Sequence, residues 1–150
     1  MKTVLTVAGS DPSGGAGIQA DIKTITAHGL YATSAITALT VQNTLGVSRV
    51  EPVPVDLVAQ QIDCVVGDIR PDAVKIGMLC NAEIVQAVAQ ALAHGQAECI
   101  VIDPVMISTS GHRLLDQEAV QWMKRKLFPM AQLITPNLPE AEDPLRNART

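Results

Sequence analysis

The chain has 150 residues, a length that suits one domain with a sizeable core. Hydrophobic residues make up 47% of the chain and aromatic residues only 2%, so we expect an aliphatic core of the α/β type. A net charge of −4 without a basic run argues against a nucleic-acid-binding protein. No apolar run approaches the roughly 20 residues that a membrane-spanning helix needs.

The start of the chain and its cysteines indicate a cellular compartment. The first residues lead directly into a predicted strand, without the pattern of a secretory signal. Cys64, Cys80 and Cys99 are odd in number and form no C-x-x-C pair. We therefore expect a cytoplasmic protein with reduced thiols and no membrane association.

Apolar strands alternate with segments of helical period. In chain order, the sequence predicts strand 3–8, helix 16–28, strand 31–40, helix 55–67, strand 73–77, helix 82–93, strand 98–102, helix 116–127 and strand 131–135. Residues 46–54 contain prolines, which suit only an edge strand. Because strand–helix–strand connections are right-handed, this order predicts a mostly parallel sheet with helices on both faces.

The pattern changes near the end of the chain. Residues 136–142 look like the start of another helix, with Pro139 near its first position. Asp143 and Pro144 interrupt that helix, and the residues after them are polar. We therefore expect residues 1–142 to be the first portion of a larger α/β domain, and 143–150 to be an atypical polar tail.

Polar or glycine-rich segments follow the predicted parallel strands. They are Gly9-Ser-Asp11, Val41-Gln-Asn-Thr44, Gly77-Met-Leu79, Asp103-Pro-Val-Met106 and Thr135-Pro-Asn-Leu-Pro-Glu140. Ligands of open parallel sheets bind outside the carboxyl ends of the strands. The sequence therefore predicts a binding site at this edge of the sheet.

The first of these loops contains a look-alike of the dinucleotide-binding fingerprint. Gly15-Ala-Gly-Ile-Gln-Ala20 fits the form G-x-G-x-x-A, but six residues separate the strand from Gly15. The second strand ends at Gln42 without the carboxylate that would hold a ribose. The glycines also lack the Lys-Ser/Thr of a Walker A loop. Dinucleotide and Walker-type nucleotide binding are both disfavoured.

Four motifs at matching strand ends resemble one enzyme family. They are Ala8-Gly-Ser-Asp-Pro-Ser-Gly-Gly-Ala-Gly-Ile-Gln-Ala-Asp21, Ile36-Thr-Ala-Leu-Thr-Val-Gln-Asn-Thr44, Lys75-Ile-Gly-Met78 and Leu133-Ile-Thr-Pro-Asn-Leu-Pro-Glu-Ala141. Their order and spacing resemble the hydroxymethylpyrimidine/phosphomethylpyrimidine kinases of thiamine biosynthesis, relatives of pyridoxal kinase in the ribokinase superfamily. The resemblance implies a Rossmann-like three-layer sandwich, with residues 1–142 as the N-terminal portion of a ribokinase-like kinase domain.

The resemblance also implies which residues bind the pyrimidine. The loop from Gly9 to Gly17, together with Asp21 on the following helix, is similar to the family's floor for the ring. Gln42 matches a glutamine whose amide pairs with the aminopyrimidine edge, since an amide offers both a donor and an acceptor. Met78 and Val105 match apolar residues that pack against the ring.

The resemblance also implies ATP and Mg²⁺ as cofactors, and a second group of residues that lie near the metal and the phosphates. Asp103 stands where the family places a carboxylate near metal and phosphates. Asn137 and Glu140 are the ends of the superfamily's Asn-x-x-Glu motif, which is associated with Mg²⁺ and its waters. The family's later glycine-rich anion hole, with its catalytic Cys or Asp, has no match in this chain. We therefore assign no catalytic residue here and expect it beyond Thr150.

Other interpretations of the same residues stay open. Gln42 fits an ordinary strand end, Asp21 a solvated helix position, and Met78 a core position. Asp103 suits a turn, and Asn137 with Glu140 suits the N-cap and first turn of a helix. The chain as a whole fits a pyridoxal kinase, or a non-catalytic remnant that binds pyrimidine. Exposed apolar sheet surface would further favour a homodimer or another oligomer.

Overall fold

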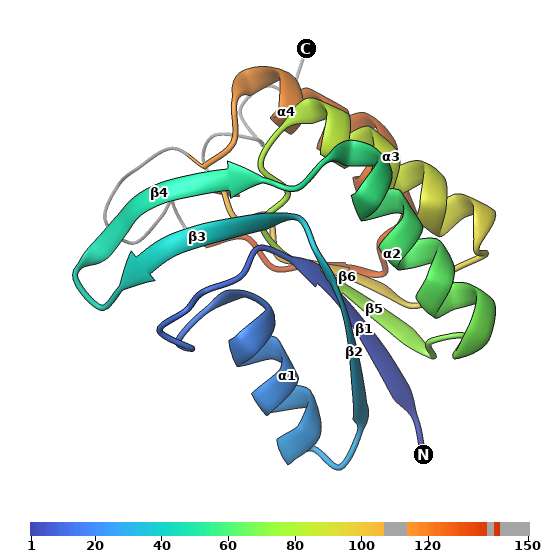
Figure 1. The fold of residues 1–150 in the computed structure, drawn as a ribbon. Helices are drawn as coiled ribbons and strands as arrows, with labels where there is room; N and C mark the ends of the chain where they lie inside the picture. Colours follow the sequence, from blue (N-terminus) through green and yellow to red (C-terminus); the bar gives the residue numbers. More distant parts are fainter. Residues whose placement is uncertain (107–113, 138–139, 142–150) are drawn as a thin grey trace.

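A five-stranded parallel sheet forms the centre of the computed structural model, which describes residues 1–106, 114–137 and 140–141 (Figure 1). In spatial order its strands are β2 (Tyr31–Ile36), β1 (Thr3–Ala8), β5 (Ala73–Ile76), β6 (Ile100–Ile102) and β7 (Leu133–Ile134). The chain adds β2 on one side of β1 and then crosses to add β5, β6 and β7 on the other side. The carboxyl ends of β1 and β5 therefore flank the point where the strand order reverses.

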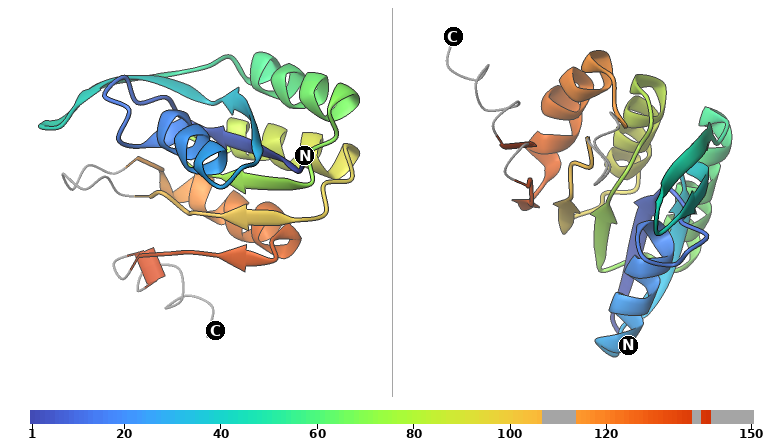
Figure 2. Two further views of the ribbon diagram at one scale, coloured as in Figure 1. Left: turned by 90° about the horizontal axis from the view of Figure 1, so that it is seen from below. Right: turned by 90° about the vertical axis from the view of Figure 1, so that its left-hand side faces the viewer.

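Helices cover the two faces of the sheet unequally (Figure 2). Helix α1 (Gly17–Ala27) packs on β1 and β2, on one face. Helices α2 (Val55–Asp68), α3 (Ala82–His94) and α4 (Gln117–Trp122) lie on the other face. The predicted parallel α/β layering is confirmed.

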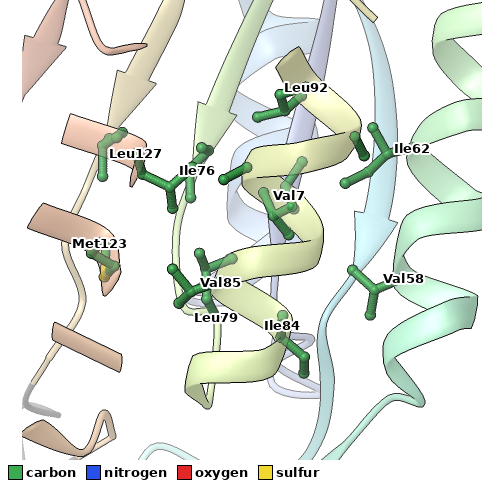
Figure 3. Close-up of a cluster of buried hydrophobic side chains, with 14 of the residues drawn as sticks. Val7, Val58, Ile62, Ile76, Leu79, Ile84, Val85, Leu92, Met123 and Leu127 are labelled. Atoms are coloured by element: carbon green, nitrogen blue, oxygen red, sulfur yellow. The ribbon is translucent and has the colours of Figure 1, made fainter. Parts of the chain in front are cut away.

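The main core lies between the sheet and the helices α2 to α4 (Figure 3). Val7 and Ile76 of the central strands meet Val85 and Leu92 of α3, and all four side chains are fully buried. Helix α3 begins as expected, because the Asn81 side chain accepts a hydrogen bond from the Ile84 amide at 2.9 Å.

Neighbouring strands place a different row of side chains on the opposite face. The register sets Thr6 of β1 beside Lys75 of β5, Lys75 beside Val101 of β6, and Val101 beside Leu133 of β7. Side chains alternate along a strand, so this row faces away from the main core and toward the side that carries α1. A charged residue thus occupies the middle of the sheet on the α1 side.

The predicted strand 31–40 is wrong in one respect, because the structure divides it at Thr37. The Thr37 amide donates to the Ala8 carbonyl (3.0 Å), and its hydroxyl donates to the Met78 carbonyl (2.6 Å). After this fully buried residue the chain leaves the parallel sheet as β3 (Ala38–Asn43). Strand β3 pairs antiparallel with β4 (Gly46–Pro52) in a separate two-stranded sheet. The predicted edge strand 46–54 thus forms, but as part of this hairpin.

The predicted helix 116–127 changes its winding halfway. Helix α4 is followed by a π-helical turn, Met123–Leu127, and a 3₁₀ turn, Phe128–Met130. Asp116 caps α4 by accepting a hydrogen bond from the Ala119 amide at 2.7 Å. Among the described residues, no helix has both the length and the apolarity to cross a bilayer.

The predicted change after residue 136 falls largely outside the described residues. Positions 138–139 and 142–150 lie outside the described residues. The proposed boundary between 1–142 and the tail 143–150 therefore stays a prediction. Residues 140 and 141 are helical, and the Ala141 amide donates to the Asn137 carbonyl at 2.8 Å.

Candidate functional site

A cavity of about 420 Å³ opens at the carboxyl ends of the strands, where the strand order reverses. Segments that follow β1, β5 and β6 line it, together with the β3–β4 hairpin and the start of α1. Every binding residue expected from the sequence lies in its wall: Gly9, Asp21, Gln42, Met78, Asp103, Val105, Asn137 and Glu140. A hollow of about 840 Å³ lies at the opposite, amino ends of the strands, where open parallel sheets do not bind their ligands.

Asp11 organises the glycine-rich loop that begins this site. Its side chain is 2% exposed and accepts hydrogen bonds from the amides of Ser13 (2.9 Å), Gly15 (3.0 Å) and Ala16 (2.8 Å). The Ser13 hydroxyl donates a fourth, at 2.7 Å. The carboxylate of Asp11 therefore occupies the position that an anionic ligand would take in a phosphate-binding loop. This geometry argues against the dinucleotide interpretation of the loop.

The protonation of Asp11 follows from these contacts. Burial by itself raises the pKa of the carboxyl group, but the hydrogen bonds from Ser13, Ala16 and Gly15 outweigh it and leave the pKa below its ordinary value of 3.8. Asp11 is thus an anion at neutral pH, balanced by backbone amides.

Two glycines allow the loop to fold tightly against the sheet. Gly17 has φ +56°, and a Cβ there would lie 2.3 Å from the Gly9 carbonyl oxygen. That same oxygen accepts a hydrogen bond from the Ile18 amide at 3.0 Å, at the start of α1. A Cβ on Gly9 would lie 2.5 Å from Cε of Met78, so the loop also packs against the end of β5. Both positions need glycine because the backbones approach so closely.

An ion pair between Asp21 of α1 and Lys75 of β5 lies at the floor of the cavity. Asp21 Oδ2 accepts hydrogen bonds from Lys75 Nζ at 3.0 Å and from the Thr6 hydroxyl at 2.6 Å. Asp21 is therefore no solvated helix residue, since its side chain is 17% exposed. Sequence reasoning did not select Lys75 as a site residue, although a lysine inside an apolar strand is itself an unusual feature.

The β3–β4 hairpin supplies the wall above the glycine-rich loop (Figure 1). Alternation along β3 turns Thr40 and Gln42 toward the cavity and leaves Leu39 and Val41 exposed. The Thr40 hydroxyl lies 2.7 Å from the Ser10 carbonyl oxygen and 3.3 Å from Gln42 Oε1. The hairpin is thereby attached to the loop, and Gln42 presents an amide to the cavity.

Asn137 and Glu140 form a reciprocal cap at the start of a helical turn. Asn137 Oδ1 accepts the Glu140 amide (2.9 Å), and Glu140 Oε2 accepts the Asn137 amide (3.1 Å). Glu140 Oε1 accepts a further bond from the Met106 amide at 3.0 Å, and its side chain is buried. The capping interpretation of this pair is thus correct, and it places a buried carboxylate in the cavity wall.

Asp103 lies nearby with a carboxyl group that is harder to ionise than usual. Burial raises its pKa, Lys75 opposes this, and the charges of Glu140 and Asp21 add to the increase. A cation or a proton is therefore favoured beside Asp103.

Asp103 and Glu140 could contribute to a magnesium site only together with water and phosphate oxygens. In residues 1–106, 114–137 and 140–141, no three His, Cys, Asp or Glu side chains gather closely enough to form a metal site. Magnesium is commonly held by one or two carboxylates together with water and phosphate oxygens. Asp103 and Glu140 suit that arrangement, and they do not suit a site made of protein ligands alone.

Comparison with known proteins identifies the family. The family model for phosphomethylpyrimidine kinase matches residues 11–148, most of the chain. The chain belongs to the phosphomethylpyrimidine kinase family. The hydroxymethylpyrimidine/phosphomethylpyrimidine kinase of Escherichia coli is 53% identical over 143 residues, which cover 94% of this chain and 54% of that protein. The chain thus spans about half the length of this relative.

Solved structures of related kinases have the same fold. The crystal structure of phosphomethylpyrimidine kinase from Clostridium difficile matches with a TM-score of 0.89 at 50% identity, over 95% of this chain and 62% of that one. Pyridoxal kinase from Staphylococcus aureus, in complex with AMP-PCP, matches with a TM-score of 0.84 at 36% identity, over 96% and 52%. The expected ribokinase-like α/β class is therefore confirmed for this member of the phosphomethylpyrimidine kinase family.

Proposed function

We propose that the cavity is the substrate site of an ATP-dependent phosphotransferase. Its substrates are 4-amino-5-hydroxymethyl-2-methylpyrimidine and the monophosphate of that compound, in thiamine biosynthesis. The observation that carries the proposal is the convergence of the residues expected to bind pyrimidine and magnesium on one cavity at the strand ends. The names of the E. coli and C. difficile relatives support the same substrates.

The pyrimidine lies between the glycine-rich loop and the hairpin in this proposal. Gln42 pairs through its amide with the ring nitrogen and the amino group, while Met78 and Val105 pack against the ring faces. Gly9 and Asp21 form the floor. A cavity of about 420 Å³ with both apolar and polar walls suits a small heteroaromatic ring.

The reaction moves the γ-phosphoryl group of ATP onto the hydroxymethyl oxygen of the alcohol, which loses its proton as ADP leaves. With the monophosphate as substrate, the acceptor is an oxygen of its phosphate group, and ADP again leaves. Asp103, Asn137 and Glu140 lie on the metal and phosphate side. A magnesium ion held there would neutralise charge on the phosphate oxygens. We place no catalytic residue among residues 1–150. The complex of S. aureus pyridoxal kinase with AMP-PCP, an ATP analogue, supports ATP as the donor, and we propose the cytoplasm as the location.

Two alternatives are kept for specific reasons. The match to S. aureus pyridoxal kinase favours pyridoxal as a second candidate substrate. The second alternative is a protein that binds pyrimidine without transferring phosphate, since the motifs matched in this chain are those for the substrate and the metal and none matches the family's glycine-rich anion hole.

Calorimetric titration with the hydroxymethylpyrimidine and with pyridoxal, beside an ATP-coupled assay, tests these functions. Pyrimidine binding with turnover supports the kinase, and binding without turnover supports the non-catalytic alternative. Tighter binding of pyridoxal favours the second substrate. Binding of neither compound contradicts the assignment of the cavity.

The substitution Gln42→Ala tests the proposed amide contact. Loss of the hydrogen bonds should weaken pyrimidine binding by about 1–3 kcal/mol. Gln90→Ala, at an exposed position on α3, is the matched control and should leave the affinity unchanged. An unchanged affinity in Gln42→Ala would remove Gln42 from the binding site.

A further inference from the structure

Lys75 stands apart among the charged residues of the cavity. Asp11, Asp21, Asp103 and Glu140 contribute carboxylates, and Lys75 is the one cationic side chain among the described residues of the wall. Backbone amides compensate Asp11 and Glu140, as shown above. The remaining carboxylates, Asp21 and Asp103, would repel an anionic substrate unless a cation faced it.

The position of Lys75 follows from the register of the sheet. Lys75 lies beside Thr6 on β1 and Val101 on β6, on the face toward α1. From there Asp21 reaches it, at 3.0 Å, and the Lys75 side chain is 27% exposed. The sheet and α1 therefore hold the ammonium group in one place.

The ammonium group points along β5 toward the strand end. A Cβ added at Gly77, two residues further on, would lie 3.0 Å from Lys75 Nζ. Glycine at this position leaves room for the ammonium group beside Met78, which lines the same cavity. An ammonium group has three N–H donors, and the bond to Asp21 uses one. Donors are thus left to face a ligand.

We propose that Lys75 is the residue that lets this site accept the phosphorylated substrate, by donating hydrogen bonds to the phosphate oxygens of the pyrimidine monophosphate. This inference rests on the proposed function and deepens it. The unphosphorylated pyrimidine carries no anion and needs no such partner. Lys75 is therefore a specificity-determining residue, which favours the monophosphate over the free alcohol. A role confined to pairing with Asp21 would affect both compounds alike.

Calorimetric titration of the wild-type chain and of Lys75→Met, with the hydroxymethylpyrimidine and with its monophosphate, tests the inference. Loss of a charge-assisted hydrogen bond should weaken monophosphate binding about 10-fold or more, while binding of the alcohol changes less than about threefold. Lys2→Met is the matched control, because Lys2 pairs with Asp72 at 2.6 Å at the other end of the sheet. It should leave both affinities unchanged.

A second variant keeps the test valid if Lys75→Met folds poorly, because that substitution leaves Asp21 unpaired. Lys75→Met combined with Asp21→Asn removes both charges, and Asp21→Asn alone is its reference. Relative to Asp21→Asn alone, the double variant should again have a higher dissociation constant for the monophosphate, while the dissociation constant for the alcohol changes little.

The possible results separate the two proposals. An unchanged ratio of the two dissociation constants in both Lys75 variants overturns the role of Lys75 and leaves the proposed function intact. A wild-type chain that binds the alcohol but not the monophosphate also overturns the role of Lys75, and it limits the proposed substrates to the alcohol. A wild-type chain that binds neither compound overturns the proposed function, and the role of Lys75 with it.

Discussion

Asp11 shows how a single side chain decides what a glycine-rich loop can bind. The closely spaced glycines before a helix resemble a dinucleotide-binding loop, although their spacing and the missing carboxylate after the second strand disfavour that function. The structure places the Asp11 carboxylate against the amides of Ser13, Gly15 and Ala16. An acidic residue six positions before the helix is not part of the usual fingerprint, so sequence reasoning did not give Asp11 this role.

We expect Asp11→Ala to lower the free energy of unfolding by about 2–3 kcal/mol, because buried amides lose a charged acceptor. Chemical denaturation at neutral pH measures the loss. Ser13→Ala removes one hydrogen bond to the same carboxylate and should cost less. Equal costs in the two variants would contradict a central role for Asp11.

The same residue predicts a dependence on pH. The pKa of Asp11 in the folded chain lies below the ordinary 3.8, so its carboxylate contributes stability above that value. This contribution is lost as the pH falls through the lower, folded-state pKa. The stability difference between the wild type and Asp11→Asn should therefore be constant near neutral pH and shrink below about pH 4.

Among the elements, the β3–β4 hairpin is the one that the sequence describes least well. Residues 31–40 alternate without a glycine or proline, so local patterning favours one continuous strand. The break at Thr37 depends on its hydrogen bonds to Ala8 and Met78, which are distant in sequence. Helix α3 was predictable because its apolar stripe and its Asn81 cap are local features.

The connection at Thr37 is testable by Thr37→Val, which keeps the shape of the side chain and removes the hydroxyl. We expect the free energy of unfolding to fall by about 1–2 kcal/mol, since the buried Met78 carbonyl loses its donor. Pyrimidine affinity should fall as well, because Thr37 connects the hairpin to Met78. Thr24→Val is the control, since its hydroxyl bonds within α1 at an exposed site. Equal stability losses in both variants would contradict the importance of this connection.

At the scale of the whole molecule, the convergence of strand ends was predictable, because parallel strands share one carboxyl edge. The charge pair of Lys75 and Asp21 was not, since it depends on the register of β1 against β5 and on the placement of α1. The fold also leaves an apolar surface exposed on the outer face of the β3–β4 hairpin, where Leu39 is 55% exposed and Val41 is 57% exposed.

We expect this outer face to cause self-association, in agreement with the oligomer that the sequence suggests. The double substitution Leu39→Lys and Val41→Lys should lower the sedimentation coefficient to that of a monomer. Leu57→Lys, at an exposed position of α2, is the control and should leave the assembly unchanged. Pyrimidine binding should survive in both, because Thr40 and Gln42 face the other way. A monomeric wild type would exclude this interface.

The cavity takes its walls from positions between Ala8 and Glu140, so a chain that has not folded almost completely has no binding site. Folding and binding are therefore one linked equilibrium. A ligand present at about 100 times its dissociation constant adds about 2.7 kcal/mol to the free energy of unfolding. The melting temperature of this chain thus reports occupancy directly, and a thermal-shift screen of pyrimidines and their phosphates ranks ligands without any turnover.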